Sequence, residues 1–339
     1  MKSLIDKSNM YKVLRDFPSQ FGKALEIAEG VKVPKKKYSN VIVAGMGGSS
    51  MPAAIIETYL GKNLKTPILI CQNYNLPKAA DSKSLVFASS FSGNTEETLS
   101  VYKECRRKKI QMVGITTGGE LAKLCQKDKT PLILIPNEGI QPRCGTGYMF
   151  TGILAAMTGA GLAPNKTAEI KAAASALSKM NFEEEARKIA SQLLGKLIVV
   201  YASEKNKEIA RICKIKFNEN SKVMAFYNYF PELNHNETAG FTNFRKENIP
   251  TVIIILRSKS DHPRILKRMD ITAEIIREKG GEVLNIAMPE GNPLTQIFGT
   301  LYFGDFVSYY LALEYNTDPS PVEVVEYLKK RLKNWTTLH

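Results

Sequence analysis

The chain has 339 residues, of which 44% are hydrophobic and 24% are charged, an ordinary composition for a globular protein with about two domains. No apolar run approaches the roughly 18 residues that a membrane-spanning helix needs, and the first residues lack the apolar core of a signal peptide. The five cysteines are widely spaced and form no C-x-x-C pair, which argues against a disulfide framework and a zinc site and favours a reducing, cytoplasmic location.

The formal net charge is +14, and Lys and Arg cluster at 33–38, 105–109 and 328–333. Such clusters can bind nucleic acid, but they also occur on solvated helix faces, and a positive field attracts small anions. The chain contains no helix-turn-helix, zinc-finger or RNA-recognition pattern, and aromatic residues do not alternate with the basic runs. We therefore predict neither a nucleic-acid nor a membrane partner, whereas a small anionic substrate remains compatible with the charge.

Short β-branched runs alternate with helical stretches through the first half of the chain. Runs of this kind, bounded by turn residues, are typical of strands that are buried on both faces of a parallel sheet. A longer helical region follows, from 147 to about 180. The expected strands are 40–45, 67–71, 85–90, 111–116 and 131–136, and the clearest helices between them are 51–60 and 95–108.

The alternation then begins again in the second half, without detectable identity to the first. The expected strands are 195–202, 222–228, 249–256 and 281–288, and the expected helices are 203–220, 261–280, 293–315 and 321–335. The pattern predicts an α/β fold of two doubly wound domains, each a mainly parallel sheet flanked by helices. We expect the domains at 1–155 and 195–339, joined by a helical connection at 156–194.

The stretch "VIVAGMGGSSMPAAII" (41–56) is a strand, a glycine-rich turn and a helix. The turn fails the dinucleotide fingerprint, because Ser50 stands where the third glycine is required, and no Gly-Lys-Ser/Thr of a P-loop follows. Backbone N–H groups at Gly47, Gly48 and Ser49 could approach a ligand. A tight turn that needs glycine for backbone freedom explains these residues equally well.

The stretch "ASSFSGNTEET" (88–98) also follows a strand and opens a helix. It offers the hydroxyls of Ser90, Ser92 and Thr95 next to the free N–H groups of a helix start, which is a favourable site for an anion. The alternative is an ordinary capping box with Asn94 as the cap and Glu97 as its partner. Three hydroxyls exceed what a cap requires, so we favour a phosphate monoester here.

A polar stretch, "NHNETAG" (234–240), interrupts the apolar second half and contains one of only three histidines in the chain. Glu237 either begins a helix after Asn236 or transfers a proton. His235, two residues earlier, is either a working histidine or a structural polar residue. The residues alone leave these alternatives open.

The two turns, "GMGGSS" and "SSFSGNTEET", resemble the sugar isomerase (SIS) domain, in which an S-x-S-G-x-T loop binds the phosphate of a phosphosugar. Nearly the whole chain resembles the bifunctional phosphoglucose/phosphomannose isomerases. This resemblance implies two SIS domains, a homodimer, no metal and no cofactor, and interconversion of glucose 6-phosphate and mannose 6-phosphate with fructose 6-phosphate. The motifs that carry it are "NEGIQPRCGTGY", "FPELNHNETAGF", "DHPR", "PEGNPL" and "GDFVSYYLALEYNTDPSPVEVVEYLKKRL".

The resemblance also implies roles for single residues. Glu237 in "HNE" corresponds to the catalytic base, and His262 in "DHPR" to a ring-opening histidine that the partner subunit supplies. Arg143 in "QPR" corresponds to the arginine near the enediolate, and Lys329 to the C-terminal lysine, although Lys330 is adjacent. The remaining positions form the substrate-binding set: Gly48 and Ser49 on the sugar side, and Ser90, Ser92 and Thr95 on the phosphate.

Each role has a structural alternative. His262 could begin a helix before Pro263, Arg143 could form a surface ion pair with Glu138, and Lys329 could be a solvated lysine. Two rival functions also remain, a phosphosugar sensor without catalysis and an amino-sugar isomerase. A sensor would need the serine and threonine loop but not a base, a histidine and an arginine together.

Overall fold

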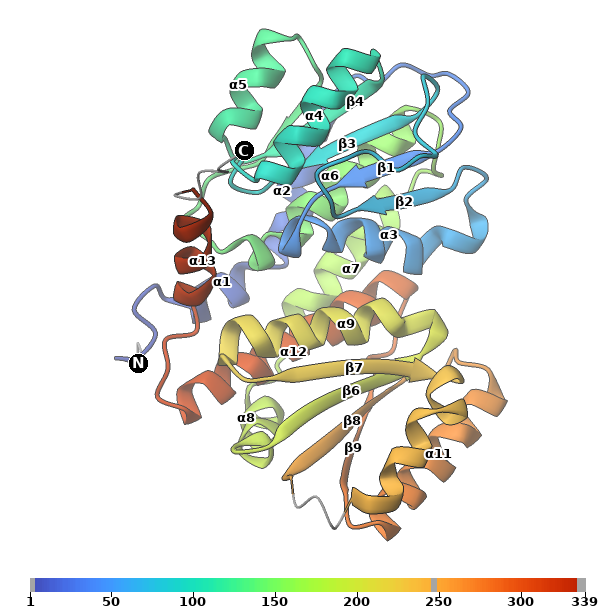
Figure 1. Ribbon diagram of the computed structural model, residues 1–339, viewed down its shortest axis with the longest axis vertical. Coiled ribbons are helices and arrows are strands. Elements are labelled where there is room, and N and C mark those ends of the chain that lie inside the picture. Colours follow the sequence, from blue (N-terminus) through green and yellow to red (C-terminus); the bar gives the residue numbers. More distant parts are fainter. Residues whose placement is uncertain (1–3, 245–248, 334–339) are drawn as a thin grey trace, which may run out of the picture.

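The computed structural model describes residues 4–244 and 249–333. It contains two α/β units, each built on its own sheet, with the N-terminal unit above the C-terminal one in Figure 1. Every strand pair in both sheets is parallel. The predicted fold class, α/β with mainly parallel sheets flanked by helices, is confirmed.

The N-terminal sheet has the strand order β2-β1-β3-β4-β5. The direction of winding changes between β1 and β3, the position at which open α/β sheets commonly bind ligands. Helices α4 and α5 cover one face, and α2, α3 and α6 cover the other. The strands are β1 (Val41–Ala44), β2 (Ile68–Cys71), β3 (Leu85–Ser89), β4 (Gln111–Thr116) and β5 (Leu132–Leu134). The helices are α2 (Ser19–Glu29), α3 (Met51–Leu60), α4 (Glu96–Lys108), α5 (Gly119–Lys127) and α6 (Thr146–Gly159).

The C-terminal sheet has the order β7-β6-β8-β9, so that β7 is an edge strand. Helices α8, α9 and α12 lie on one face, toward the N-terminal unit, and α11 covers the opposite face. The strands are β6 (Leu197–Ser203), β7 (Ala225–Phe230), β8 (Thr251–Arg257) and β9 (Glu282–Ala287). The helices are α8 (Glu183–Leu193), α9 (Lys207–Lys216), α11 (Pro263–Glu278) and α12 (Pro293–Glu314).

Helix α12 joins the two units into one core. It is buried along most of its length, as expected for a helix that is apolar on all sides. It packs against α8 and α9, and also against α1 (Met10–Asp16) and α7 (Thr167–Lys179). Its apolar side chains belong to a cluster that continues into the N-terminal sheet. None of the described helices is long and apolar enough to cross a membrane.

Several expected elements have different bounds. The helix expected at 203–220 is α9, which ends at Lys216 and continues as a π-helical turn, η5 (Phe217–Ser221). The helical region after 147 divides into α6 and α7. Helices α1, α2 and α5 had not been predicted, and the last described helix is α13 (Glu323–Lys333).

Candidate active site

The two predicted ligand-binding turns lie side by side at the switch point of the N-terminal sheet. They follow β1 and β3, which are neighbours, and parallel strands end at the same edge of a sheet. The backbone N–H of Phe91 donates to Ser49 Oγ at 2.9 Å, and Ser89 Oγ donates to the Ser49 carbonyl oxygen at 2.7 Å. These bonds join the glycine turn and the serine loop into one unit.

Two hydroxyls of the serine loop, those of Ser90 and Thr95, meet at the start of α4. Ser90 Oγ and Thr95 Oγ1 are 2.8 Å apart, and Ser92 is exposed. Thr95 is the N-cap of α4 but makes no side-chain capping bond. Asn94 does not cap this helix, because its Oδ1 accepts the N–H of Glu120 at 3.0 Å. The capping-box alternative is therefore wrong, and the loop retains hydroxyls beside a helix N-terminus, as an anion site requires.

The turn that contains Arg143 lies beside the glycine turn and is the third segment of the candidate site. It is a 3-10 turn, η3 (Pro142–Cys144), before α6. A Cβ atom at Gly48 would come within 2.8 Å of the backbone nitrogen of Arg143, so this position admits only glycine without a shift. Glu138 bonds to Lys23 at 2.6 Å instead of Arg143. The surface ion pair considered as an alternative for Arg143 is therefore wrong.

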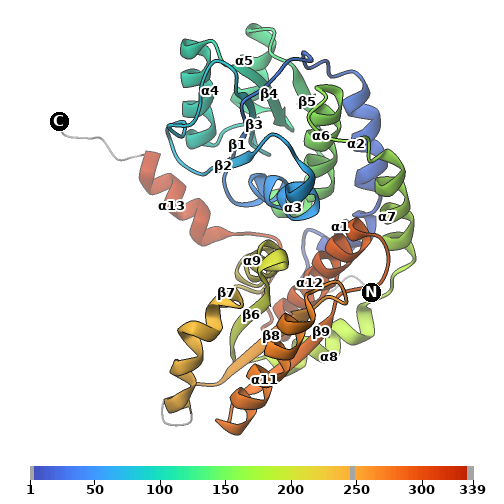
Figure 2. The same cartoon turned by 90° about the vertical axis from the view of Figure 1, so that its right-hand side faces the viewer.

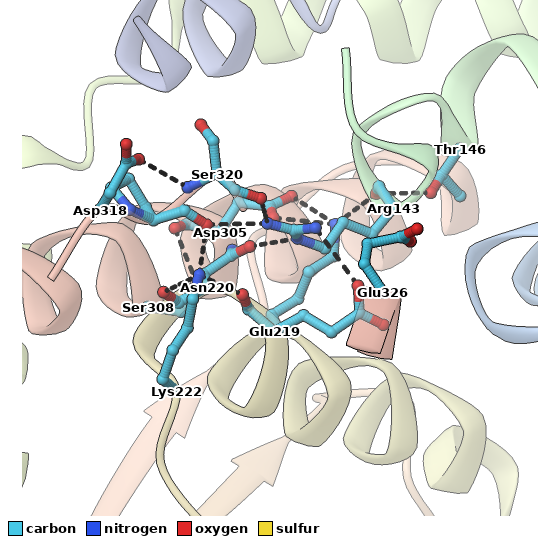
Figure 3. A network of polar contacts seen from close by, with 12 residues as sticks. Arg143, Thr146, Glu219, Asn220, Lys222, Asp305, Ser308, Asp318, Ser320 and Glu326 are labelled. Atoms are coloured by element: carbon cyan, nitrogen blue, oxygen red, sulfur yellow. Dashed lines mark hydrogen bonds and ion pairs between the residues drawn. The ribbon is translucent and has the colours of Figure 1, made fainter. Parts of the chain in front are cut away.

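The Arg143 side chain extends into the C-terminal unit and is only 1% exposed (Figure 3). Nε donates to Asn220 Oδ1, Nη1 lies 3.3 Å from Glu219 Oε2, and Nη2 donates to the carbonyl oxygens of Pro319 and Ser320 at 2.8 and 3.0 Å. Glu219 and Asn220 come from the π-helical turn η5. The Glu219 side chain is 29% exposed and is thus the accessible member of the Arg143–Glu219 pair.

Sequence reasoning missed Glu219. The available signal was "NENSK" (218–222), a polar stretch directly before β7 that was interpreted as the end of a helix. π-Helical turns within or beside α-helices are frequent at functional sites.

Glu237 lies on the other face of the C-terminal sheet. Its carboxylate accepts hydrogen bonds from the Tyr201 hydroxyl and the Asn228 amide. Tyr201 belongs to the cluster under α11, and burial together with the bond to Glu237 raises the pKa of its hydroxyl far above the usual value. Arg143 contacts the α9 side of this sheet. Within one chain, the sheet therefore separates Glu237 from Arg143.

His235, His262 and Lys329 are surface groups, and His339 lies outside the described residues. His262 is the N-cap of α11, and its Nδ1 accepts the N–H of Arg264 at 3.0 Å, as its structural alternative predicts. His235 is exposed after β7, at the end of η6 (Glu232–His235). Lys329 is exposed on α13 and pairs with Glu326 at 2.7 Å. The structure thus gathers the serine loop, the glycine turn and Arg143, but not His235, His262 and Lys329.

Among the residues that the structure describes, no group of three or more His, Cys, Asp or Glu side chains is placed to hold a metal ion. The two turns and the paired α/β units define a two-domain sugar isomerase (SIS) protein. Residues 182–332 match the family profile described as bacterial phospho-glucose isomerase C-terminal SIS domain. A hypothetical protein of Thermus thermophilus has the same fold, with a TM-score of 0.73 at 16% identity over 95% of this chain and 90% of its own.

Curated relatives show to which family of SIS proteins the chain belongs. The bifunctional phosphoglucose/phosphomannose isomerase of Caldicellulosiruptor bescii is 36% identical over 95% of this chain and 98% of its own. The protein of the same name from Thermoplasma acidophilum is 34% identical over 87% and 90% of the two chains. The chain belongs to the bifunctional phosphoglucose/phosphomannose isomerase family, an enzyme family of isomerases, as its motifs had indicated.

Proposed function

We propose that the protein interconverts glucose 6-phosphate and mannose 6-phosphate with fructose 6-phosphate through an enediol. The observation that carries this proposal is the Arg143–Glu219 pair beside the two turns, in a chain of this family. Glucose and mannose 6-phosphates differ only at C2 and give the same enediol. One carboxylate beside C1 and C2 can therefore serve both sugars, by removing a proton from one carbon and returning it to the other.

The phosphate binds to the serine loop, where Ser90, Ser92 and Thr95 surround the start of α4. The N–H groups of Gly47 and Gly48 face the sugar in this proposal, whereas the Ser49 N–H donates to the Met46 carbonyl oxygen at 2.9 Å within the turn. Arg143 stabilises the negative oxygen of the enediolate, because a fixed guanidinium in a water-poor site favours a charge that develops during the reaction.

Glu219 is our candidate for the base. The motif match favoured Glu237, but the Glu237 carboxylate is held by Tyr201 and Asn228 on the face of the sheet opposite Arg143. Glu219 lies 3.3 Å from Arg143 and is partly exposed. Glu237 remains the alternative, which would require that a partner subunit bring it to the site.

A homodimer is supported by apolar side chains that the single chain leaves uncovered. Helix α13 projects from the body, and Figure 2 shows it on the same side as the edge strand β7. Val324 on α13 is 82% exposed and Met224 before β7 is 68% exposed; Tyr327, Leu328, Leu332, Phe226 and Tyr227 are also exposed. Exposed apolar side chains on one side of a molecule are typical of an interface, and most homo-oligomers are twofold dimers.

The second subunit would also supply the histidine that opens the sugar ring. In one chain, β7 runs between Glu219 and His235, which places them at opposite ends of a strand about 20 Å long. His262 caps α11, which covers the face of the sheet opposite Arg143. Either histidine could reach Glu219 only from a partner. The cytoplasm is the proposed location, since all five cysteines are free and buried.

The dimer is tested by the double substitution Val324→Asp and Leu328→Asp. Both side chains are exposed on α13, so the chain should fold, whereas charges on the apolar surface should prevent association. We expect a monomer by light scattering and a loss of nearly all activity on closed-ring sugar. A dimer of unchanged stability and activity would exclude α13 from the interface.

Sharing of the site is tested by mixing subunits. Glu219→Gln homodimers and His262→Ala homodimers should each be poorly active. A random one-to-one mixture makes half of the dimers mixed, each with one intact site, so activity should recover to about a quarter of wild type. The same experiment with His235→Ala in place of His262→Ala shows which of the two histidines opens the sugar ring. Failure of both mixtures, despite confirmed subunit exchange, would contradict a shared site.

The phosphate loop is tested by Ser92→Ala with Thr95→Ala. Hydrogen bonds to a charged group are worth roughly 1.5–3 kcal/mol each, so the KM for 6-phosphosugars should rise well over tenfold. The chain should remain folded, because Thr95 makes no capping bond and Ser92 is exposed. A KM equal to that of wild type would show that the hydroxyls do not bind the phosphate.

The reaction itself is tested by coupled assays with glucose 6-phosphate, mannose 6-phosphate and glucosamine 6-phosphate, with and without a chelator. Product from the first two sugars, undiminished by the chelator, supports the proposal. Turnover of the amino sugar alone would favour the amino-sugar alternative, and binding without turnover would favour a sensor.

A further inference from the structure

A buried ion pair lies between α9 and α12, behind Arg143. Lys216 Nζ is 2.8 Å from Asp305 Oδ1, and both side chains are buried. The same Nζ donates to the backbone carbonyl oxygen of Arg143 at 2.7 Å. Burial of two charges is unfavourable unless their geometry is good and their remaining hydrogen bonds are satisfied, so such a pair is weak evidence for stability by itself.

The side chain of Arg143 is held by a second, parallel set of contacts. Asn220 Oδ1 accepts from Arg143 Nε, and Asn220 Nδ2 donates to Ser308 Oγ at 2.9 Å. Asp305 and Ser308 are three residues apart on α12 and hence share one face of that helix. The backbone of Arg143 is thus linked to α12 through Lys216, and its guanidinium is linked to the same helix through Asn220. Figure 3 shows Asn220, Asp305 and Ser308 beside Arg143.

We propose that Lys216 and Asp305 are positioning residues that fix Arg143 against the glycine turn, with Asn220 fixing its guanidinium. This inference rests on the proposed function. Gly48 packs so closely on the Arg143 backbone that a shift of this residue would disturb the turn that faces the sugar. Electrostatic stabilisation of a transition state depends on donors that are already in place, so a loosened Arg143 would slow the chemical step more than it would weaken phosphate binding.

The alternative is that the pair only stabilises the contact between the two units, through the bond from Lys216 to the Arg143 carbonyl oxygen. Matched substitutions separate these roles. Lys216→Met alone leaves the Asp305 carboxylate buried without a partner and should lower the Tm strongly. Lys216→Met with Asp305→Leu replaces the pair by apolar side chains, which should restore most of the Tm. It does not restore the hydrogen bond to the Arg143 carbonyl oxygen.

The expected result for the double variant is a near-normal Tm with a kcat that is about 100-fold lower, the scale expected for loss of one transition-state donor. Its KM for fructose 6-phosphate should remain near the wild-type value, because the serine loop is untouched. Lys196→Met is the control: it breaks a surface pair with Glu282, 2.7 Å long, and should leave kcat and Tm near wild type.

A double variant with wild-type kcat would overturn the positioning role. If its Tm does not recover, Asn220→Ala decides instead, because it removes no charge: we expect a lower kcat with unchanged affinity for inorganic phosphate, and a wild-type kcat would refute the proposal. A second readout is binding of a phosphorylated aldonic acid whose carboxylate mimics the enediolate. Its affinity should fall at least tenfold in both variants. A wild-type protein without isomerase activity would refute the proposed function itself.

Discussion

Glu219→Gln is expected to lower turnover of both glucose 6-phosphate and mannose 6-phosphate by several orders of magnitude. The amide keeps the shape of the side chain and can still bond to Arg143, but it cannot accept the proton from C1 or C2. Phosphate affinity should be largely unchanged, because the serine loop is not altered. Steady-state kinetics with both sugars, together with phosphate binding, measure these effects.

Glu237→Gln is the matched comparison. It removes a carboxylate that bonds to Tyr201 and Asn228, and we expect it to retain more than about a tenth of the wild-type turnover. The reverse outcome, an inactive Glu237 variant and an active Glu219 variant, would restore the assignment from the motif match. It would also mean that a partner subunit brings Glu237 to the phosphate loop.

Gly93→Ala is expected to damage the serine loop severely. Gly93 has φ +72°, a region in which an L-residue costs about 1–2 kcal/mol. A Cβ atom there would also lie 1.9 Å from the carbonyl oxygen of Gly118, and this backbone atom cannot move away alone. We expect a large loss of Tm and a rise of more than tenfold in the KM for phosphosugars, from the loss of charged hydrogen bonds.

Comparison with Gly195→Ala separates the effect of backbone strain from the effect of the steric clash that a Cβ atom at Gly93 would cause. Gly195 has φ +74°, nearly the same backbone conformation, but a Cβ atom there would meet no atom within 4 Å. Its variant should lose only the stability that the backbone strain costs and should keep its KM. If both variants lose the same Tm and keep a normal KM, the serine loop can move enough to relieve the clash with Gly118 without losing its affinity for the substrate.

The sheets could be predicted from sequence because their signals are local. β1 and β3 are short apolar runs, fully buried and bounded by turn residues. Helix α1 was not predicted, because it has only seven residues, lacks a side-chain cap and packs against α12, almost 300 residues later in the chain. A contact of this range leaves no periodic pattern that distinguishes such a helix from a loop.

Prediction of the candidate site from sequence has the same limit, because only local signals are visible in the sequence. The serine loop and the glycine turn could be predicted, since each is a continuous stretch whose chemistry is visible in its own letters. Glu219 could not, because its importance lies in a contact with Arg143, 76 residues away. Glu237 attracted attention as a carboxylate in a polar stretch, but the sequence does not say on which face of the sheet that stretch folds.

The most direct test of the central claim is isomerisation of glucose 6-phosphate and of mannose 6-phosphate in D2O by one preparation of the enzyme. A carboxylate that lifts the C2 proton exchanges part of it with solvent before returning it to C1. We predict that fructose 6-phosphate formed from either sugar carries deuterium at C1, and that Glu219→Gln abolishes both reactions together. Conversion of only one sugar, or of both without any deuterium at C1, would contradict a shared enediol and a single base.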